Sequence, residues 1–293
     1  PVVRAGPYQL KGTFTKQELW VMISSARDRD MHLQTLGDEG YRRRKKRGET
    51  YNSGDRFTNW LTQNYMWIII GLLAVYVGLP FLAPVLMKNG KEWGANLIYK
   101  MYSVMCHQTA FRSWFLFGEQ AAYPSELAHL DEYMTYEEIM GIRGARSDPA
   151  TDLNLFVLQA REFIGNAQTG YKVALCERDI AMYGSLLLFG LIFVATGRRI
   201  PPLSWKVWIL IGILPIAIDG VSQLPGFLTW IPINLPYRES TPFLRTLTGF
   251  LFGITTGWYL FPVIEETMME TRRALVWKNA RSQQAAGEGG QAS

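Results

Sequence analysis

The sequence predicts an all-α fold: a polytopic membrane helix bundle with about four transmembrane helices, one further embedded or interfacial helix, and cytoplasmic N and C termini. Three observations predict this fold. The chain has four long apolar segments, and its basic clusters all fall on one side of the membrane if these segments cross it. A largely acidic segment separates the first two apolar segments. Hydrophobic residues make up 48% of the 293 positions, and they are strongly segregated from the charged ones.

The four apolar segments have the length of membrane spans. Residues 66–87, 180–197 and 246–264 contain no charged residue, and residues 207–218 form a shorter uncharged run. A bilayer core about 30 Å thick needs roughly 20 apolar residues of helix. The shorter run reaches that length if it extends from about residue 203 to residue 223. The sequence therefore predicts a multi-pass protein of the inner (cytoplasmic) membrane.

The basic residues set the predicted topology. They gather in Arg42–Arg47, in Arg198 and Arg199, and after the last span, in a group formed by Arg272, Arg273, Lys278 and Arg281. Basic residues beside membrane spans mark the cytoplasmic side. With four spans, all three groups and both termini are cytoplasmic, and the acidic residues 119–178 lie outside. The net charge of +5 then reflects topology, and no nucleic-acid partner is expected.

Residues 95–117 are the ambiguous segment. They are largely apolar but include Lys100, His107 and Arg112, each of which is costly at the centre of a membrane. We interpret the segment as an embedded or interfacial helix on the outer side. A full span is the alternative, and it would reverse the side on which Arg198 and Arg199 lie.

The predicted organisation has five parts. They are a cytoplasmic extension at 1–60, the first transmembrane helix and a CHQ-containing helix at 61–118, an outer insertion at 119–178, three transmembrane helices at 179–264, and a cytoplasmic tail at 265–293 that is disordered from residue 282. No apolar run lies near Pro1, so we expect no cleavable signal peptide.

Capping patterns predict three helix starts outside the spans. Thr15 and Thr135 are each followed three positions later by a glutamate, as in a capping box. Asp148-Pro149 supplies an N-cap and a first-turn proline for a helix at 151–164.

Four polar groups lie at one predicted membrane level, on the outer side. They are Cys106-His107 within "MCHQTAFRSW", the Cys176–Asp179 block, Asp219 with Gln223, and Arg238–Thr241 before the last span. Cys176 and Asp179 are three positions apart and share a helix face. Ionisable residues near a membrane are expensive unless they are paired, so we expect the four groups to converge.

Blocks of the sequence also resemble a known family. "CHQTAFRSWFLFG", "CERDIAMYGSLLLFG", "LPIAIDGVSQLPGF" and "RESTPFLRTLTGFLFG" are similar to successive blocks of the prokaryotic integral membrane protein family of domain of unknown function 2085. The resemblance covers about residues 66–262 and implies no activity. The family pattern matches at Cys106, His107, Gln108, Arg112, Ser113, Cys176, Arg178, Tyr183, Gly184, Asp219, Gly220, Gln223, Arg245, Thr248 and Gly249. Asp179 stands where the family has a second cysteine, which argues against a C-x-x-C dithiol.

The chain has two cysteines, and three states remain open for them. They form a structural disulfide, as expected in an oxidising compartment, or they remain free thiols, or they bind a metal. In the metal hypothesis the ligands are Cys106, His107, Cys176 and Asp179, and the candidate cofactor is zinc, which accepts thiolate, imidazole and carboxylate ligands. His32 and His129 are expected to be exposed to solvent.

The remaining polar residues predict either an ion-pair network or a pocket for an anionic head group or substrate, because arginine binds phosphate and carboxylate bidentately. This polar pocket consists of Gln108, Arg112, Arg178, Asp219, Gln223, Arg238, Glu239 and Arg245. We expect Arg112 to pair with Asp219. Gly249, Gly253 and Gly257 on the last span predict close helix packing.

Three function classes remain: an enzyme acting on a lipid-linked substrate, a transporter or binding protein for an anion, and a structural or accessory subunit of a larger membrane complex. In the last class the cysteines form a disulfide and the partners are other membrane-protein subunits as well as membrane lipid. The chain has no Walker loop, GxSxG elbow, HExxH pair or dinucleotide fingerprint, which excludes the common enzyme classes that carry these motifs. The sequence favours an integral membrane protein with an outer-face Cys/His/Asp/Arg site.

Overall fold

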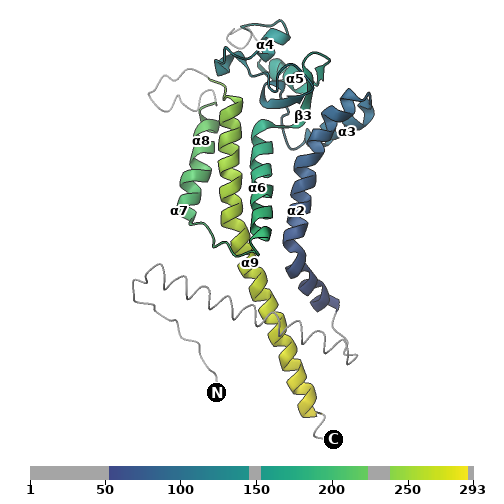
Figure 1. The fold of residues 1–293 in the computed structure, drawn as a ribbon, viewed down its shortest axis with the longest axis vertical. Coiled ribbons are helices and arrows are strands. Elements are labelled where there is room, and N and C mark those ends of the chain that lie inside the picture. The colour runs from purple at the N-terminus through teal and green to yellow at the C-terminus, as the bar shows by residue number, and fades with distance from the viewer. Residues whose placement is uncertain (1–52, 145–152, 224–237, 290–293) are drawn as a thin grey trace. The chain divides into compact units, whose positions relative to one another are not determined.

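The computed structural model describes residues 53–144, 153–223 and 238–289, with side chains up to residue 278. It is mostly helical. Three of the described helices are long and apolar enough to cross a membrane: α2 (Ser53–Lys88), α6 (Glu177–Ala195), and the Pro242–Lys278 part of α9 (Pro242–Gly289) (Figure 1). The chain divides into two compact units, one of residues 1–62 with 269–293 and the other of residues 63–268. The second unit holds the candidate site.

The predicted third span is also helical, in three successive pieces. They are α7 (Trp205–Val207), the π-helical η4 (Trp208–Ile213) and α8 (Leu214–Val221). At a rise of 1.5 Å per residue, the whole stretch is at most about 25 Å long. It is therefore shorter than the other three apolar helices.

Close approach of helix backbones holds α6 against α9. A Cβ atom added at Gly253 would lie 2.0 Å from the carbonyl oxygen of Met182 and 2.1 Å from Oγ of Ser185. A Cβ atom at Gly249 would lie 2.6 Å from the carbonyl oxygen of Arg178, and one at Gly257 would lie 3.0 Å from Cβ of Phe189. The close packing predicted from the glycine stripe is confirmed, because a Cβ atom would clash with the backbone of α6 at Gly249 and Gly253 and would be tightly packed at Gly257.

A partly buried ion pair connects the residues after α6 to α9 and α2. The Glu265 carboxylate of α9 accepts hydrogen bonds from the Tyr65 hydroxyl of α2 at 2.6 Å and from Arg198 at 3.2 Å. Arg198 also lies over the Tyr65 ring, with its Cζ 5.4 Å from the ring centre. Aromatic residues, among them Phe189 and Phe193 of α6, pack in the core beside it.

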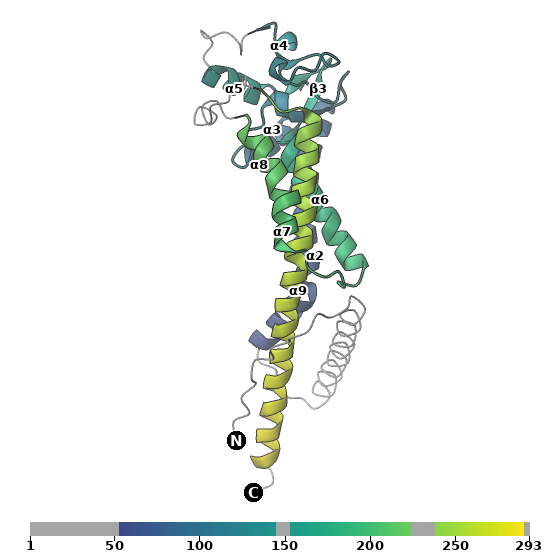
Figure 2. The same ribbon diagram turned by 90° about the vertical axis from the view of Figure 1, so that its left-hand side faces the viewer.

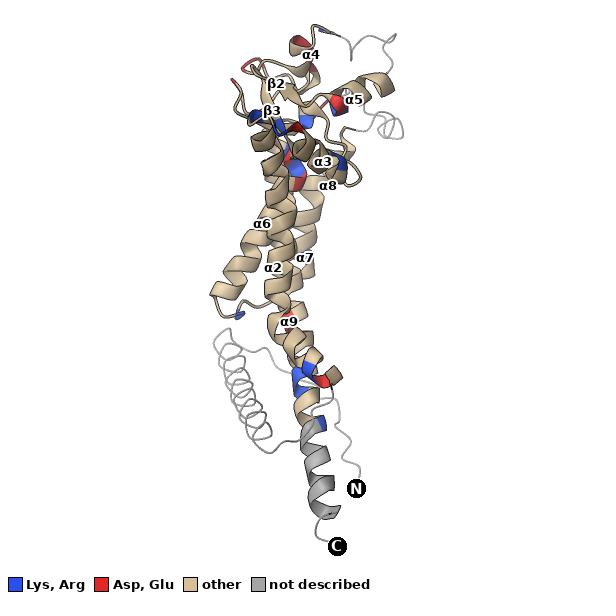
Figure 3. Cartoon of the chain, turned by 90° about the vertical axis from the view of Figure 1, so that its right-hand side faces the viewer, with Lys and Arg blue, Asp and Glu red and all other residues tan. Residues whose placement is uncertain are grey.

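Within residues 63–268, charged residues lie near α3 and α8 and, in smaller number, after α6 and on α9, and α6 carries none between these two groups (Figure 3). Large apolar side chains such as Trp67, Leu72 and Val75 point outward from α2 and are exposed. An exposed apolar surface of this kind is what a lipid-facing helix presents.

A small domain covers the end of the bundle near α3 (Figure 2). Its described residues form α3 (Glu92–Tyr102), a three-stranded antiparallel sheet in the order β1-β3-β2, and four short helices. The strands are β1 (Ser113–Leu116), β2 (Gly165–Asn166) and β3 (Gly170–Cys176), and the short helices are η1 (Ala110–Arg112), η2 (Glu126–Ala128), α4 (Tyr136–Ile139) and α5 (Leu153–Glu162). This sheet corrects the prediction of an all-α chain.

The helix expected over residues 95–117 is also corrected. The helical part, α3, ends at Tyr102, and residues 113–116 form β1 instead. The physical reason is long-range pairing with β3, in which Ser113 lies opposite Cys176 and Leu116 opposite Tyr171. The CHQ motif therefore lies in the connection between a helix and a strand.

The capping predictions have mixed outcomes. Thr135 and Glu138 form the reciprocal capping box at the start of α4, as predicted. The helix predicted at 151–164 is found as α5, whereas the pattern at Thr15 lies outside the described residues. In the tail, α9 continues to Gly289, and residues 290–293 lie outside the described residues.

Candidate functional site

Cys106, Cys176 and Asp179 come together at the base of the small domain, and we call them the thiol–carboxylate cluster. Their two Sγ atoms and a carboxylate oxygen all lie within 4.8 Å of one another. Cys176 ends β3 and is the N-cap of α6, and Asp179 is in the first turn of that helix. Cys106 follows the turn after α3 and is buried beside Tyr102 and Leu175.

The sheet and Gln108 hold Cys106 against Cys176. Gln108 has a left-handed backbone conformation, with φ of 52°, and its side chain is buried. Its Nε2 donates to the carbonyl oxygen of Tyr99 at 3.1 Å and to that of Ala174 at 2.7 Å. These two bonds connect the end of α3 to β3 just before Cys176. Gln108, predicted as part of a polar pocket, thus bonds to backbone in this position.

Lys172 is a buried amine beside the cluster. Its Nζ donates to the carbonyl oxygen of Gln108 at 2.9 Å and to that of Arg161. Burial lowers the pKa of Lys172 to about 7. The same lysine is close enough to Cys106 for the two charges to stabilise each other.

The two thiols share a hydrogen bond, and their pKa values move apart. The bond from Cys176 lowers the pKa of Cys106. The same bond raises the pKa of Cys176, and burial and the neighbouring Asp179 raise it further. Cys106 is thus the thiol that ionises first. Both cysteines are free thiols in the structure.

The structure does not bring His107 into the cluster. Its side chain is exposed, whereas that of Cys106 is buried. The prediction of four ligands rested on a shared membrane depth and on a helix expected over residues 95–117. Residues 106–109 are instead an irregular connection, in which Cys106 is buried and His107 is exposed outside the group of ligand atoms.

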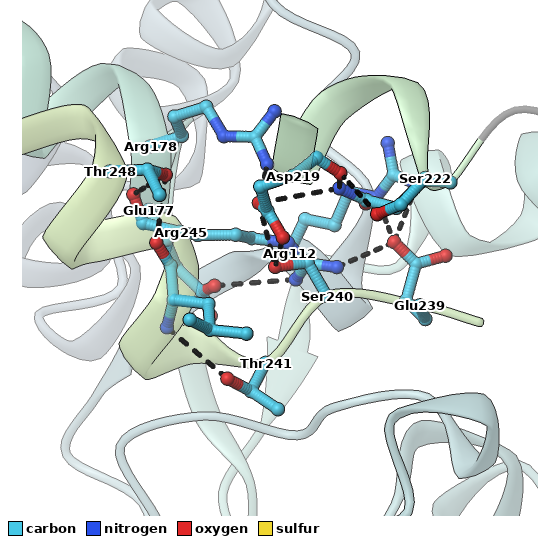
Figure 4. Close-up of polar contacts among 12 residues, drawn as sticks. Arg112, Glu177, Arg178, Asp219, Ser222, Glu239, Ser240, Thr241, Arg245 and Thr248 are labelled. Atoms are coloured by element: carbon cyan, nitrogen blue, oxygen red, sulfur yellow. Dashed lines mark hydrogen bonds and ion pairs between the residues drawn. The ribbon is translucent and has the colours of Figure 1, made fainter. Parts of the chain in front are cut away.

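A second group lies beside the cluster, and we call it the arginine–carboxylate network (Figure 4). Its members are the four arginines Arg112, Arg178, Arg238 and Arg245 and the three acids Glu177, Asp219 and Glu239. They come from η1, from the first turn of α6, from α8 and from the residues around the start of α9. The first turn of α6 therefore contributes to both groups.

Arg245 is at the buried centre of the network. It donates to Glu239 at 2.5 Å, to Glu177 at 3.3 Å and to the carbonyl oxygen of Phe111 at 2.9 Å. Glu239 also accepts from Arg112, at 2.6 Å from Nη2 and 2.8 Å from Nε. A buried carboxylate thus bridges two guanidinium groups, which offsets the desolvation of each.

Asp219 is the second bridging carboxylate. It pairs with Arg178 and, at 3.0 Å, with Arg238, and it accepts from the Ser240 hydroxyl at 2.8 and 2.9 Å. Gln223 donates to its carbonyl oxygen at 2.6 Å. The predicted Arg112–Asp219 pair is therefore wrong, since Arg112 pairs with Glu239 and Asp219 pairs with two other arginines.

Sequence reasoning missed three members of the site. Glu177 lies inside the Cys176–Asp179 block, Ser240 lies beside Glu239, and Lys172 is four positions before Cys176. A signal was available for Glu177, because a carboxylate at the start of an apolar helix needs a cation partner. Lys172 gave no such signal, because a single lysine in a strand is usually exposed.

Residues 163–259 match the family described as predicted membrane protein (DUF2085). An uncharacterised protein of Methanocaldococcus jannaschii is 24% identical to the chain over 211 residues, which cover 69% of this chain and 93% of that protein. No solved structure is significantly similar to the chain. The matched region holds Cys176, Asp179 and the three network acids, so the resemblance to this membrane protein family seen in the sequence blocks is confirmed over residues 163–259.

Proposed function

We propose that the protein is a multi-pass protein of the cytoplasmic membrane that binds zinc at the thiol–carboxylate cluster, on the outer face of the membrane. The observation that carries the proposal is the approach of three ligand atoms of Cys106, Cys176 and Asp179 within 4.8 Å of one another. Thiolate and carboxylate together form a donor set that zinc accepts.

The spacing supports a tetrahedral metal with little rearrangement. Zinc–sulfur bonds of about 2.3 Å place tetrahedral ligands about 3.8 Å apart, so the three side chains need to close in by about 1 Å at most. Three protein ligands leave a fourth position open, the arrangement found where zinc activates water or binds a substrate. The direction of the thiol pKa shifts also supports binding, because the pKa of Cys106 is lowered and metal binding can displace the proton of Cys176.

The membrane placement in this proposal has four spans. Residues 205–221 act as the third span despite their π-helical part, and both termini are cytoplasmic. The positions of Arg198 and Arg199 after α6 support this topology. The interfacial helix is α3, because Trp93, Leu97 and Met101 form one exposed apolar face and Ile98 and Tyr99 pack inward.

Metal analysis of the purified protein tests the proposal. We expect about one zinc per chain in the wild type, and loss of most of it in Cys106→Ser, Cys176→Ser and Asp179→Asn. His107→Ala is the matched control, since this exposed residue adjoins Cys106 but lies outside the cluster. It should retain metal.

Thiol counting under denaturing conditions completes the experiment. Two free thiols after zinc removal agree with the proposal. A wild type with neither metal nor free thiols contradicts it and supports the accessory-subunit alternative with a structural disulfide. Loss of zinc from His107→Ala alone would instead return His107 to the ligand set.

A further inference from the structure

The arginine–carboxylate network carries more positive than negative charge. Among the described residues, four guanidinium groups face three carboxylates, and five ion pairs join these residues to one another. Arginine remains protonated in proteins. Within the described part of the chain, the network therefore has one more positive than negative charge, at the end of an apolar helix bundle where unpaired charge is costly.

The carboxylates of the network are also more deeply buried than most of its arginines. The side chains of Glu177, Asp219 and Glu239 are no more than 5% exposed. Three arginines are much more open, with side-chain exposures of 37% for Arg112, 23% for Arg178 and 40% for Arg238. The carboxylates thus form a buried base, and the accessible rim consists of guanidinium groups.

The three rim arginines, Arg112, Arg178 and Arg238, have hydrogen-bond donors that their carboxylate partners do not use. Among the described residues, Arg178 pairs through Nη2 alone, and its buried Nε has no partner. Arg112 uses Nε and Nη2 on Glu239, and Arg238 uses Nε and Nη2 on Ser222 and Asp219. Within the described residues, no hydrogen bond or ion pair is made by Nη1 of Arg112, Arg178 or Arg238. Buried carboxylates therefore fix the orientation of guanidinium groups whose remaining donors are available.

We propose that this rim binds a phosphate group, held by Arg112, Arg178 and Arg238. A phosphate supplies the missing negative charge, and its several oxygens accept from more than one planar guanidinium group at once. The phosphate belongs to a lipid head group at the outer membrane surface or to a free anion. The proposal goes beyond metal binding and does not depend on it.

Two binding measurements on the purified full-length protein in detergent test the proposal and separate the sources. Native mass spectrometry counts retained phosphatidylglycerol against phosphatidylcholine, and calorimetry measures the affinity for inorganic phosphate. We expect at least one of the two ligands to bind. Arg112→Gln and Arg238→Gln should each weaken it about tenfold, because each removes charge-assisted donors.

Arg143→Gln is the matched control. Arg143 is an exposed arginine of the small domain that pairs with Glu138, outside the network. This variant should bind as the wild type does. Arg112→Lys keeps the charge and checks that a loss does not come from misfolding, since it should restore part of the affinity.

The outcomes are distinct from those of the zinc experiment, because zinc content is measured in the same samples. Retention of phosphatidylglycerol alone identifies a lipid head group, and binding of inorganic phosphate alone identifies a soluble anion. Absence of both in a wild type that holds zinc overturns the phosphate proposal and leaves the zinc proposal intact. Equal loss in Arg143→Gln would also overturn it, because nonspecific surface charge would then explain the binding.

Discussion

Lys172 places an amine inside the small domain, where two backbone carbonyl oxygens accept its hydrogen bonds. Its pKa is about 7 in the folded protein, against about 10.4 in an unfolded chain. Between these values the unfolded state holds a proton that the folded state has released. Stability should therefore rise with pH from about 7 to about 10, and fall again as pH returns to 7.

We expect Lys172→Met to remove this part of the pH dependence. The slope in question is at most about 1.4 kcal/mol per pH unit. Unfolding of reduced, metal-free protein in detergent at pH 7 and pH 9 measures it. An equal rise with pH in the variant and the wild type would assign the effect to other groups.

The buried carboxylates differ in what they support. Glu239 neutralises Arg245, whose side chain is only 3% exposed, whereas Asp219 pairs with two partly exposed arginines. Glu239→Gln should therefore destabilise the protein by about 3 kcal/mol or more, because it weakens the pairing of a buried cation. Asp219→Asn should cost less. Comparing the denaturation midpoints of the two variants checks this order, and the reverse order would contradict it.

For single residues, the sequence identified which side chains belong to the site better than it identified their ion-pair partners. Cys106, Cys176 and Asp179 were predicted together, and the structure brings them together. Asp219 was wrongly predicted as the ion-pair partner of Arg112, because Asp219 and Glu239 have about the same predicted depth and depth alone does not distinguish them. Only the path of the chain before α9 decides that Glu239 reaches Arg112 instead.

Among the elements, the contact between α6 and α9 depends on glycine. Gly253→Ala would place a methyl group 2.0 Å from a backbone oxygen of α6, which cannot move without displacing the helix. We expect a loss of about 1–3 kcal/mol or more. Gly184→Ala is the control, because a Cβ there meets nothing within 4 Å. It should be neutral or slightly stabilising in the same thermal unfolding measurement. Equal effects would show that helix propensity, not packing, sets the response.

The helices were predictable from sequence, and the sheet was not. Uncharged runs of about 20 residues have few alternatives to a helix in a membrane protein. Residues 105–116 are short, mixed in polarity and paired with a strand about 60 positions away, so no local pattern specifies them. The two cysteines and Asp179 of the predicted ligand set lie together, whereas His107, chosen from its membrane depth, is exposed outside the thiol–carboxylate cluster.

For the whole molecule, topology separates the four-span proposal from a three-span chain. If α2, α6 and α9 alone crossed the membrane, the two termini would lie on opposite sides. We expect an impermeant maleimide to label Glu132→Cys in intact cells and Ala274→Cys only after permeabilisation, each in a Cys106→Ser, Cys176→Ser background. Both positions are exposed. Labelling of position 274 in intact cells would contradict four spans.

The pairing of Ser113 with Cys176 has a consequence for the order of folding. Closing a loop of about 60 residues costs about 3.6 kcal/mol in chain entropy, and contacts within the loop do not offset this cost. The thiols cannot meet until β3 has joined β1. We expect protection of Cys106 from a thiol reagent during synthesis to report the moment when the small domain is complete, and under the zinc proposal metal binding follows that moment.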